Sequence, residues 1–156
     1  MNLNEKQISR ERALRLNPLV LAYVGDAVHA LWLKSRLAVS SDRKAGALSK
    51  ISNRLLSARA QSEACDRLSD FFDETEKDVF RRARNCHNNT PAKNATLEQY
   101  KKATGLEAVL GFLYVSGDAG RILELLNAAY EKGRNLSDEY RRQKRGRRGF
   151  ESGHDH

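Results

Sequence analysis

Residues 16–37 read LNPLVLAYVGDAVHALWLKSRL, and this stretch decides how the rest of the chain is interpreted. Asn17 and Pro18 are typical of a helix start, because asparagine caps free N–H groups and proline needs no hydrogen-bond donor at the first helical position. In the first eighteen residues of the stretch, Asp26 is the only formal charge. A central aspartate would cost about 3 kcal/mol in a bilayer. We therefore expect a buried helix, running to about Leu37, rather than a membrane span.

A second run of the same kind, ATGLEAVLGFLYVSG, occupies residues 103–117, and its only formal charge is Glu107. Burying an unpaired carboxylate costs several kcal/mol, so each acid needs a partner. A basic side chain on another helix is the simpler explanation for one lone acid. Two acids on the two most apolar helices would repel each other unless a cation lay between them. Mg²⁺ accepts carboxylate oxygens, water and phosphate, so a shared magnesium site is the sharper hypothesis.

The remainder of the chain also predicts helices, because the strict alternation of apolar and polar residues that marks strands is absent. Apolar residues recur at three- and four-residue steps from Arg43 to Leu68, with a break near Ser57. We therefore predict an all-α fold with about seven helices. Their expected ranges are about 5–14, 18–37, 43–57, 57–68, 73–85, 98–115 and 118–133.

Charge and composition favour a polyanionic partner. The 156 residues carry a formal net charge of +8, and nucleic acid is the commonest polyanion that a basic domain binds. From Arg141 onward the chain has six basic and two acidic residues and almost no apolar ones. We therefore expect one domain over residues 1–137, followed by a basic, disordered tail over residues 138–156.

Cysteine use and the N-terminal sequence predict a cytoplasmic protein. Cys65 and Cys86 lack the close spacing of zinc ligands or a redox motif, so both are expected to be free thiols. The first sixteen residues, MNLNEKQISRERALRL, have scattered charges and no apolar run of the length that a secretory signal requires.

The two acidic runs resemble the ribonuclease III family. LAYVGDAVHALWLKSRL is similar to the family's signature segment, TGLEAVLGFLYVSGD is similar to its second acidic segment, and their order and separation also match. The resemblance covers about residues 16–126. It is greatest to the Mini-ribonuclease III group, whose members lack a double-stranded RNA-binding domain, and the RRARN stretch at residues 81–85 is similar to that group's loop entry. Ala22 and Thr104 stand where full-length members carry two more acids, and the Mini-ribonuclease III group is similar in lacking those acids.

This resemblance implies a fold, a reaction and a site. It implies a ribonuclease III-type helical domain in which Asp26 and Glu107 bind Mg²⁺ and act in catalysis. The implied reaction is cleavage of double-stranded RNA to a 5′-phosphate and a 3′-hydroxyl, here in maturing precursor 23S ribosomal RNA. The resemblance also implies a homodimer with Tyr23 at its contact, and a ribosomal protein that presents the substrate.

Other residues have weaker assignments. Basic and amide side chains near the start of the second acidic helix are candidates for contacts to RNA phosphates and riboses. They are Arg81, Arg82, Arg84, Asn85, Asn88, Asn89, Lys93, Lys101 and Lys102. His29 is expected to be a locally bonded core histidine. Gly25 and Gly111 would admit either a substrate or a neighbouring helix.

The sequence also leaves a non-catalytic function open. An RNA-binding or ribosome-assembly factor on the same fold would retain Asp26 and Glu107 only as structural partners. A helical DNA-binding regulator would need a helix-turn-helix, which is not recognisable in this sequence. Metal-dependent cleavage separates these functions from the enzyme.

Overall fold

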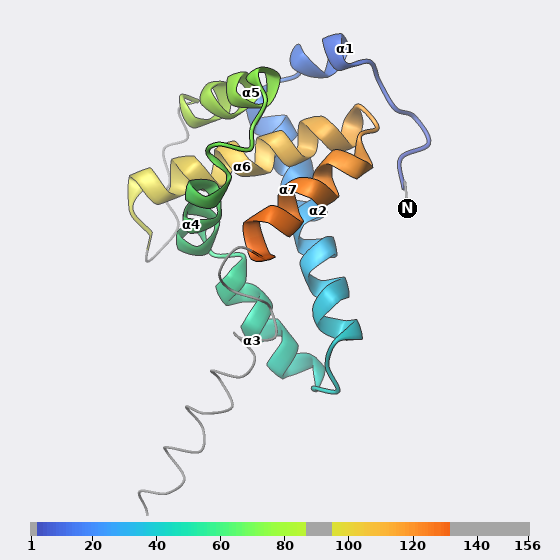
Figure 1. The fold of residues 1–156 in the computed structure, drawn as a ribbon, viewed down its shortest axis with the longest axis vertical. Helices are drawn as coiled ribbons and strands as arrows, with labels where there is room; N and C mark the ends of the chain where they lie inside the picture. Colours follow the sequence, from blue (N-terminus) through green and yellow to red (C-terminus); the bar gives the residue numbers. More distant parts are fainter. Residues whose placement is uncertain (1–2, 87–94, 132–156) are drawn as a thin grey trace, which may run out of the picture.

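Two long helices, α2 (Pro18–Val39) and α6 (Leu97–Val115), cross at the centre of the molecule (Figure 1). The computed structural model describes residues 3–86 and 95–131. These ranges contain five further helices and no strand. The five are α1 (Arg10–Leu14), α3 (Ala45–Leu55), α4 (Ala58–Leu68), α5 (Glu74–Arg84) and α7 (Ala119–Glu131). All of them but α3 pack around the crossing. The predicted all-α fold is therefore confirmed.

Side-chain caps set the helix boundaries. Ser57 accepts a hydrogen bond from the Ala60 N–H and starts α4, which confirms the predicted break between α3 and α4. Capping boxes start α5 and α6, where Asp73 pairs with Glu76 and Thr96 with Gln99. These caps bind N–H groups that lack partners within the helix.

The predicted start of the first helix at Glu5 is wrong. Ser9 caps α1 by accepting a hydrogen bond from the Arg12 N–H, so the helix begins at Arg10. Immediately before this cap, the Ile8 N–H donates to the Val115 carbonyl at the end of α6. This bond holds the preceding chain against α6, in a path that is not helical.

Gly25 and Gly111 allow the backbones of α2 and α6 to touch. A Cβ atom on Gly25 would lie 1.6 Å from the carbonyl oxygen of Glu107, and one on Gly111 would lie 1.8 Å from that of Leu21. Neither position can hold any other residue at this separation. Of the two explanations for these glycines, close helix packing is the one that applies.

The apolar core has two parts. The larger part surrounds α6 and includes Leu21, Leu110 and Phe112, which are fully buried. A smaller, separate cluster of Leu33, Leu37 and Ile51 joins α3 to the C-terminal half of α2. α3 therefore extends from the main body on a small core of its own, as Figure 1 shows.

A buried ion pair joins α5 to α7. Glu76 is fully buried, and its two carboxylate oxygens accept hydrogen bonds of 2.7 and 2.9 Å from the Arg121 guanidinium. Arg121 also donates to the Phe71 carbonyl. Glu76 thus meets the basic partner that a lone buried carboxylate requires.

Some predicted features lie outside the described residues. These are the basic tail from residue 138, the end of the last helix near Gly133, and Asn88, Asn89 and Lys93. Within the described ranges, the helices are too short or too polar to span a bilayer.

We expect Gly25→Ala to destabilise the protein by about 3 kcal/mol or more, because the new methyl group must push the two central helices apart. Gly46→Ala on α3 is the matched control, since a Cβ atom there meets nothing within 4 Å. It should be neutral or stabilise the protein by up to about 1 kcal/mol. Urea unfolding measures both changes. Equal stability of the two variants would contradict the close crossing.

Candidate active site

The helix crossing brings Asp26 and Glu107 together. Asp26 directly follows Gly25, and the carbonyl that Gly25 approaches belongs to Glu107 itself. The Glu107 carboxyl hydrogen-bonds the Asp26 carboxylate. Two acids that are 81 positions apart in the sequence therefore form one site where α2 and α6 cross.

The expectation that both carboxylates are buried is wrong for Asp26. Asp26 is exposed and Glu107 is partly buried. The reason is that the core covers only one side of α2, although its sequence is apolar on nearly all sides. Val20, Tyr23 and Leu31 on this helix are also exposed. The pair is therefore open to solvent on the side of Asp26.

Burial and repulsion raise the pKa of Glu107. The largest cause is burial, followed by the negative charge of Asp26 and the hydrogen bond between the two groups, and together they raise the pKa to about 8. Among the described residues, no basic side chain forms an ion pair with either carboxylate. Unlike Glu76, this pair is compensated by a shared proton, and a cation could take that proton's place.

The two carboxylates fit a magnesium ion that keeps part of its water shell. Their hard oxygen donors and open side match the preference of Mg²⁺ for a few carboxylates, several waters and a substrate phosphate. The described residues contain no cluster of three or more histidine, cysteine or acidic side chains. Ala22 is buried, and the Thr104 hydroxyl donates to the Tyr100 carbonyl at 3.0 Å, so neither extends the site. Water and substrate must supply the remaining ligands.

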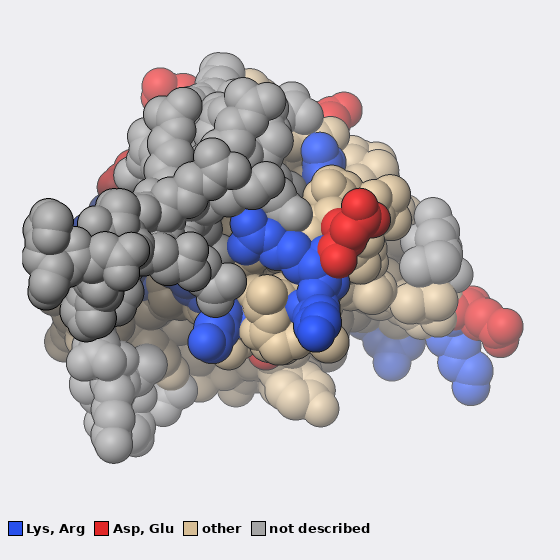
Figure 2. Space-filling view, turned by 90° about the horizontal axis from the view of Figure 1, so that it is seen from below, with Lys and Arg blue, Asp and Glu red and all other residues tan. Residues whose placement is uncertain are grey.

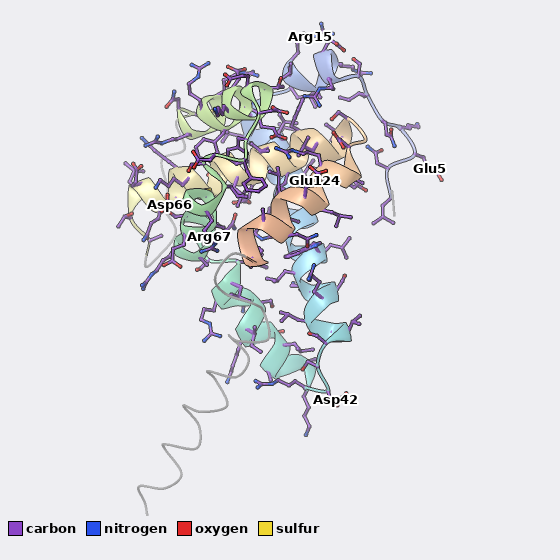
Figure 3. All side chains as sticks on the ribbon, viewed as in Figure 1. Glu5, Arg15, Asp42, Asp66, Arg67 and Glu124 are labelled. Atoms are coloured by element: carbon purple, nitrogen blue, oxygen red, sulfur yellow. The ribbon has the colours of Figure 1, made fainter. Side chains whose placement is uncertain are left out.

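α4 lies behind Glu107. The buried Cys65 thiol donates to the Lys102 carbonyl at 3.3 Å, and burial raises its pKa to about 12, with a further contribution from the charge of Glu107. Asp66, labelled on α4 in Figure 3, accepts a 2.8 Å bond from the Lys102 ammonium. The Cys65 thiol is thus neutral at physiological pH. As predicted, Cys65 and Cys86 are both free thiols.

His29 belongs to the core, as predicted, but its bond is not local. Its Nε2 lies 2.7 Å from the Tyr130 hydroxyl of α7, and the ring is fully buried. Burial lowers the pKa of His29 to about 4, and the neighbouring Gln61 side chain opposes that shift in part. His29 is therefore neutral at physiological pH and joins α2 to α7.

The structure separates the predicted RNA-binding residues into different roles. Arg82 donates to the Leu14 carbonyl at 2.7 Å and so fastens α5 to α1, which is a structural role. Asn85 is the C-cap of α5. Arg81 forms an ion pair with Asp78, Arg84 with Glu98, and Lys102 with Asp66. Lys101 is partly buried. Phosphate contacts by these paired side chains stay a prediction.

An apolar groove adjoins the site. It has a volume of about 560 Å³, and Asp26 lies on its wall together with Tyr23, Leu31, Trp32 and Leu123. Tyr23 is 81% exposed and Leu123 49%. Tyr23 is predicted as a contact residue from the sequence, whereas Leu123 is not. The signal for Leu123 is an apolar residue outside the core-facing side of α7.

We expect Glu107→Gln to gain stability relative to the parent protein as pH rises in chelator. Because the folded-state pKa of Glu107 is about 8 and its ordinary value is 4.5, the parent loses stability from about pH 4.5 to pH 8. Glutamine cannot ionise, so the relative gain should reach about 1 kcal/mol or more at pH 8. Urea unfolding at pH 5 and pH 8 measures it. A loss of about 3 to 5 kcal/mol at both pH values would indicate a broken salt bridge instead.

Comparison with known proteins gives a consistent assignment. Residues 19–118 match the family model described as the ribonuclease III domain, which includes both Asp26 and Glu107. Two curated relatives are named Mini-ribonuclease 3. The protein of Thermoanaerobacter is 36% identical, over 82% of this chain and 90% of the relative. The protein of Staphylococcus aureus is 36% identical, over 72% of this chain and 85% of the relative.

A crystal structure of a Fusobacterium nucleatum protein superposes with a TM-score of 0.68 at 27% sequence identity, and the match covers 77% of this chain and 94% of that one. The family model, the curated relatives and the shared fold all extend over most of the described helices. The chain therefore belongs to the ribonuclease III family of endoribonucleases.

Proposed function

We propose that this protein is a magnesium-dependent endoribonuclease that cuts double-stranded RNA at the Asp26–Glu107 pair. The observation that carries the proposal is a pair of facing carboxylates that is open to solvent on one side and has no basic ion-pair partner among the described residues. A structural pair has no need of this opening, whereas a metal site must admit a phosphate. The ribonuclease III match over both acids supports the same role.

Asp26 and Glu107 would hold the ion between α2 and α6. When bound, Mg²⁺ supplies Lewis acidity at the scissile phosphate and lowers the pKa of water. Glu107 must release the proton that it shares with Asp26 before both carboxylates can bind the ion. Asp26, the exposed member, lies on the side from which a duplex can approach. The backbone contact at Gly25 and Gly111 fixes the separation of the two carboxylates.

The product and substrate assignments follow the family. We propose hydrolysis that leaves a 5′-phosphate and a 3′-hydroxyl, and a substrate in precursor 23S ribosomal RNA that a ribosomal protein presents. The similarity to proteins named Mini-ribonuclease 3 supports this substrate. A cytoplasmic location agrees with that substrate.

We also propose that two copies associate through the apolar groove beside Asp26. Tyr23, Leu31 and Leu123 expose apolar surface there, and monomeric proteins rarely leave large apolar patches open. A two-fold dimer pairs one surface with itself and so supplies one centre for each strand of a duplex. Tyr23 would lie at this contact.

Asp26→Asn and Glu107→Gln should each reduce cleavage of duplex RNA by at least a hundredfold, because each removes a charged magnesium ligand. Duplex binding should persist, since phosphate contacts elsewhere remain. The matched control is Glu74→Gln on α5, whose side chain is 93% exposed and should not affect the rate. Gel assays of a labelled duplex with Mg²⁺ measure cleavage, and binding is measured in chelator.

If Asp26→Asn cut duplex RNA at the parent rate, the magnesium site would be refuted. If the parent protein bound duplex RNA and cut none with Mg²⁺, the evidence would favour the non-catalytic alternative, an RNA-binding or ribosome-assembly factor.

Tyr23→Ala should weaken the homodimer at least tenfold without unfolding the subunit, because it removes a large side chain from the proposed contact. Val39→Ala is the control, since Val39 is 90% exposed at the far end of the same helix. Sedimentation velocity over a concentration series measures both. Unchanged dimer dissociation in Tyr23→Ala would remove Tyr23 from the contact, and a parent protein that stays monomeric would refute the dimer itself.

A further inference from the structure

The segment that precedes α1 runs along the turn between α6 and α7 (Figure 1). Residues 3–8 of this segment form no helix. The Ile8 N–H donates to the Val115 carbonyl at 2.9 Å, and the Ile8 side chain packs against the larger core around α6. The Gln7 side chain lies over Gly117, where a Cβ atom would be 2.1 Å from the Gln7 amide oxygen. These two anchors hold residues 3–8, which we call the strap, against the body of the protein.

The strap places an exposed leucine beside the site. Leu3 lines the apolar groove on whose wall Asp26 lies, and it is 62% exposed. It is the only apolar residue between positions 3 and 7, which read LNEKQ. Glu5, labelled in Figure 3, is exposed at the outer edge of the strap. The strap thus presents charge to solvent, while Leu3 borders the groove.

The exposure of Leu3 shows that it does not fill the groove of its own subunit. A side chain that filled the groove would be buried by the groove walls. With Leu3 in place, however, the groove keeps a volume of about 560 Å³, and Tyr23 on its wall remains 81% exposed. Leu3 therefore enlarges the exposed apolar surface instead of covering it. A contiguous apolar surface of this kind is typical of an interface with another macromolecule.

The groove is poor in charge. Asp26 is the one charged side chain among the described residues that line it. Figure 2 shows basic side chains in the middle of the view and mainly uncharged surface immediately to their right, on the side where the strap lies in Figure 1. A nucleic acid would find no cation in the groove wall. A second copy of this chain would instead bring the same apolar side chains to a two-fold contact.

We infer that the strap is part of the contact between two copies of this chain, and that the partner copy covers Leu3. This inference rests on the proposed function, which places the second copy on the same groove. Ordering a loose segment on association costs free energy, but the anchors at Gln7 and Ile8 already hold the strap within the single subunit. Covering Leu3 should therefore add its apolar surface to the contact at little entropic cost.

Leu3→Ser should weaken the homodimer about five- to tenfold, because it removes an apolar side chain that the contact buries. Leu3→Met keeps an apolar side chain of similar volume and should restore the parent affinity. Leu97→Ser on α6 is the matched control, since Leu97 is 53% exposed but does not line the groove. Sedimentation velocity over a concentration series, in chelator and without RNA, measures dimer dissociation for all three variants. Urea unfolding of the dissociated subunits should show equal stability.

Equal dimer dissociation in the parent protein and in Leu3→Ser would overturn the inference. Equal weakening in Leu97→Ser would also overturn it, because the loss would then not depend on the groove. A tighter dimer in Leu3→Ser would overturn it as well, and would mean that the strap competes with the second copy for the groove. Failure of the proposed function is seen separately in the parent protein, which would stay monomeric at every concentration or would cut no duplex RNA with Mg²⁺.

Discussion

The contact between the backbones of α2 and α6 is the constraint on which the rest of the structure depends. Two glycines let the helices approach until any side chain at either position would overlap a carbonyl group. Asp26 is adjacent to one of these glycines, and Glu107 provides the carbonyl that the same glycine meets. The closest point of the core is thus also the base of the site. Because protein interiors are close-packed, the core holds the backbone that carries the two carboxylates in a fixed position.

The protein compensates two acids in opposite ways. Glu76 is fully buried, and the guanidinium of Arg121 satisfies it inside the fold. Glu107 is also desolvated, yet its neighbour is another carboxylate, and the pair reaches solvent through Asp26. A buried ion pair needs nothing from outside the chain. Two facing carboxylates repel each other once both are ionised, and an external cation would relieve that repulsion. This difference distinguishes a structural acid from a binding site more clearly than burial alone does.

Helix ranges and the two acids were predictable from the sequence because they depend on local signals. A capping serine at Ser57 and a lone charge within each apolar run are visible without a structure. Exposure was harder to predict, since α2 is apolar on nearly all sides and only the packing shows which side stays open. Arg82 was assigned to RNA, although its partner, the Leu14 carbonyl, is distant in sequence.

The separate small core beneath α3 has an evolutionary consequence. Leu33, Leu37 and Ile51 form this core, and among the described residues the partly buried Trp32 is the one side chain that packs against both it and the cluster around α6. Substitutions on the outer face of α3 are therefore insulated from the glycine crossing and from the carboxylates. A lineage can exchange that face, residue by residue, while its chemistry stays constant. Divergence should accordingly be tolerated more readily on α3 than on the helices that carry the crossing.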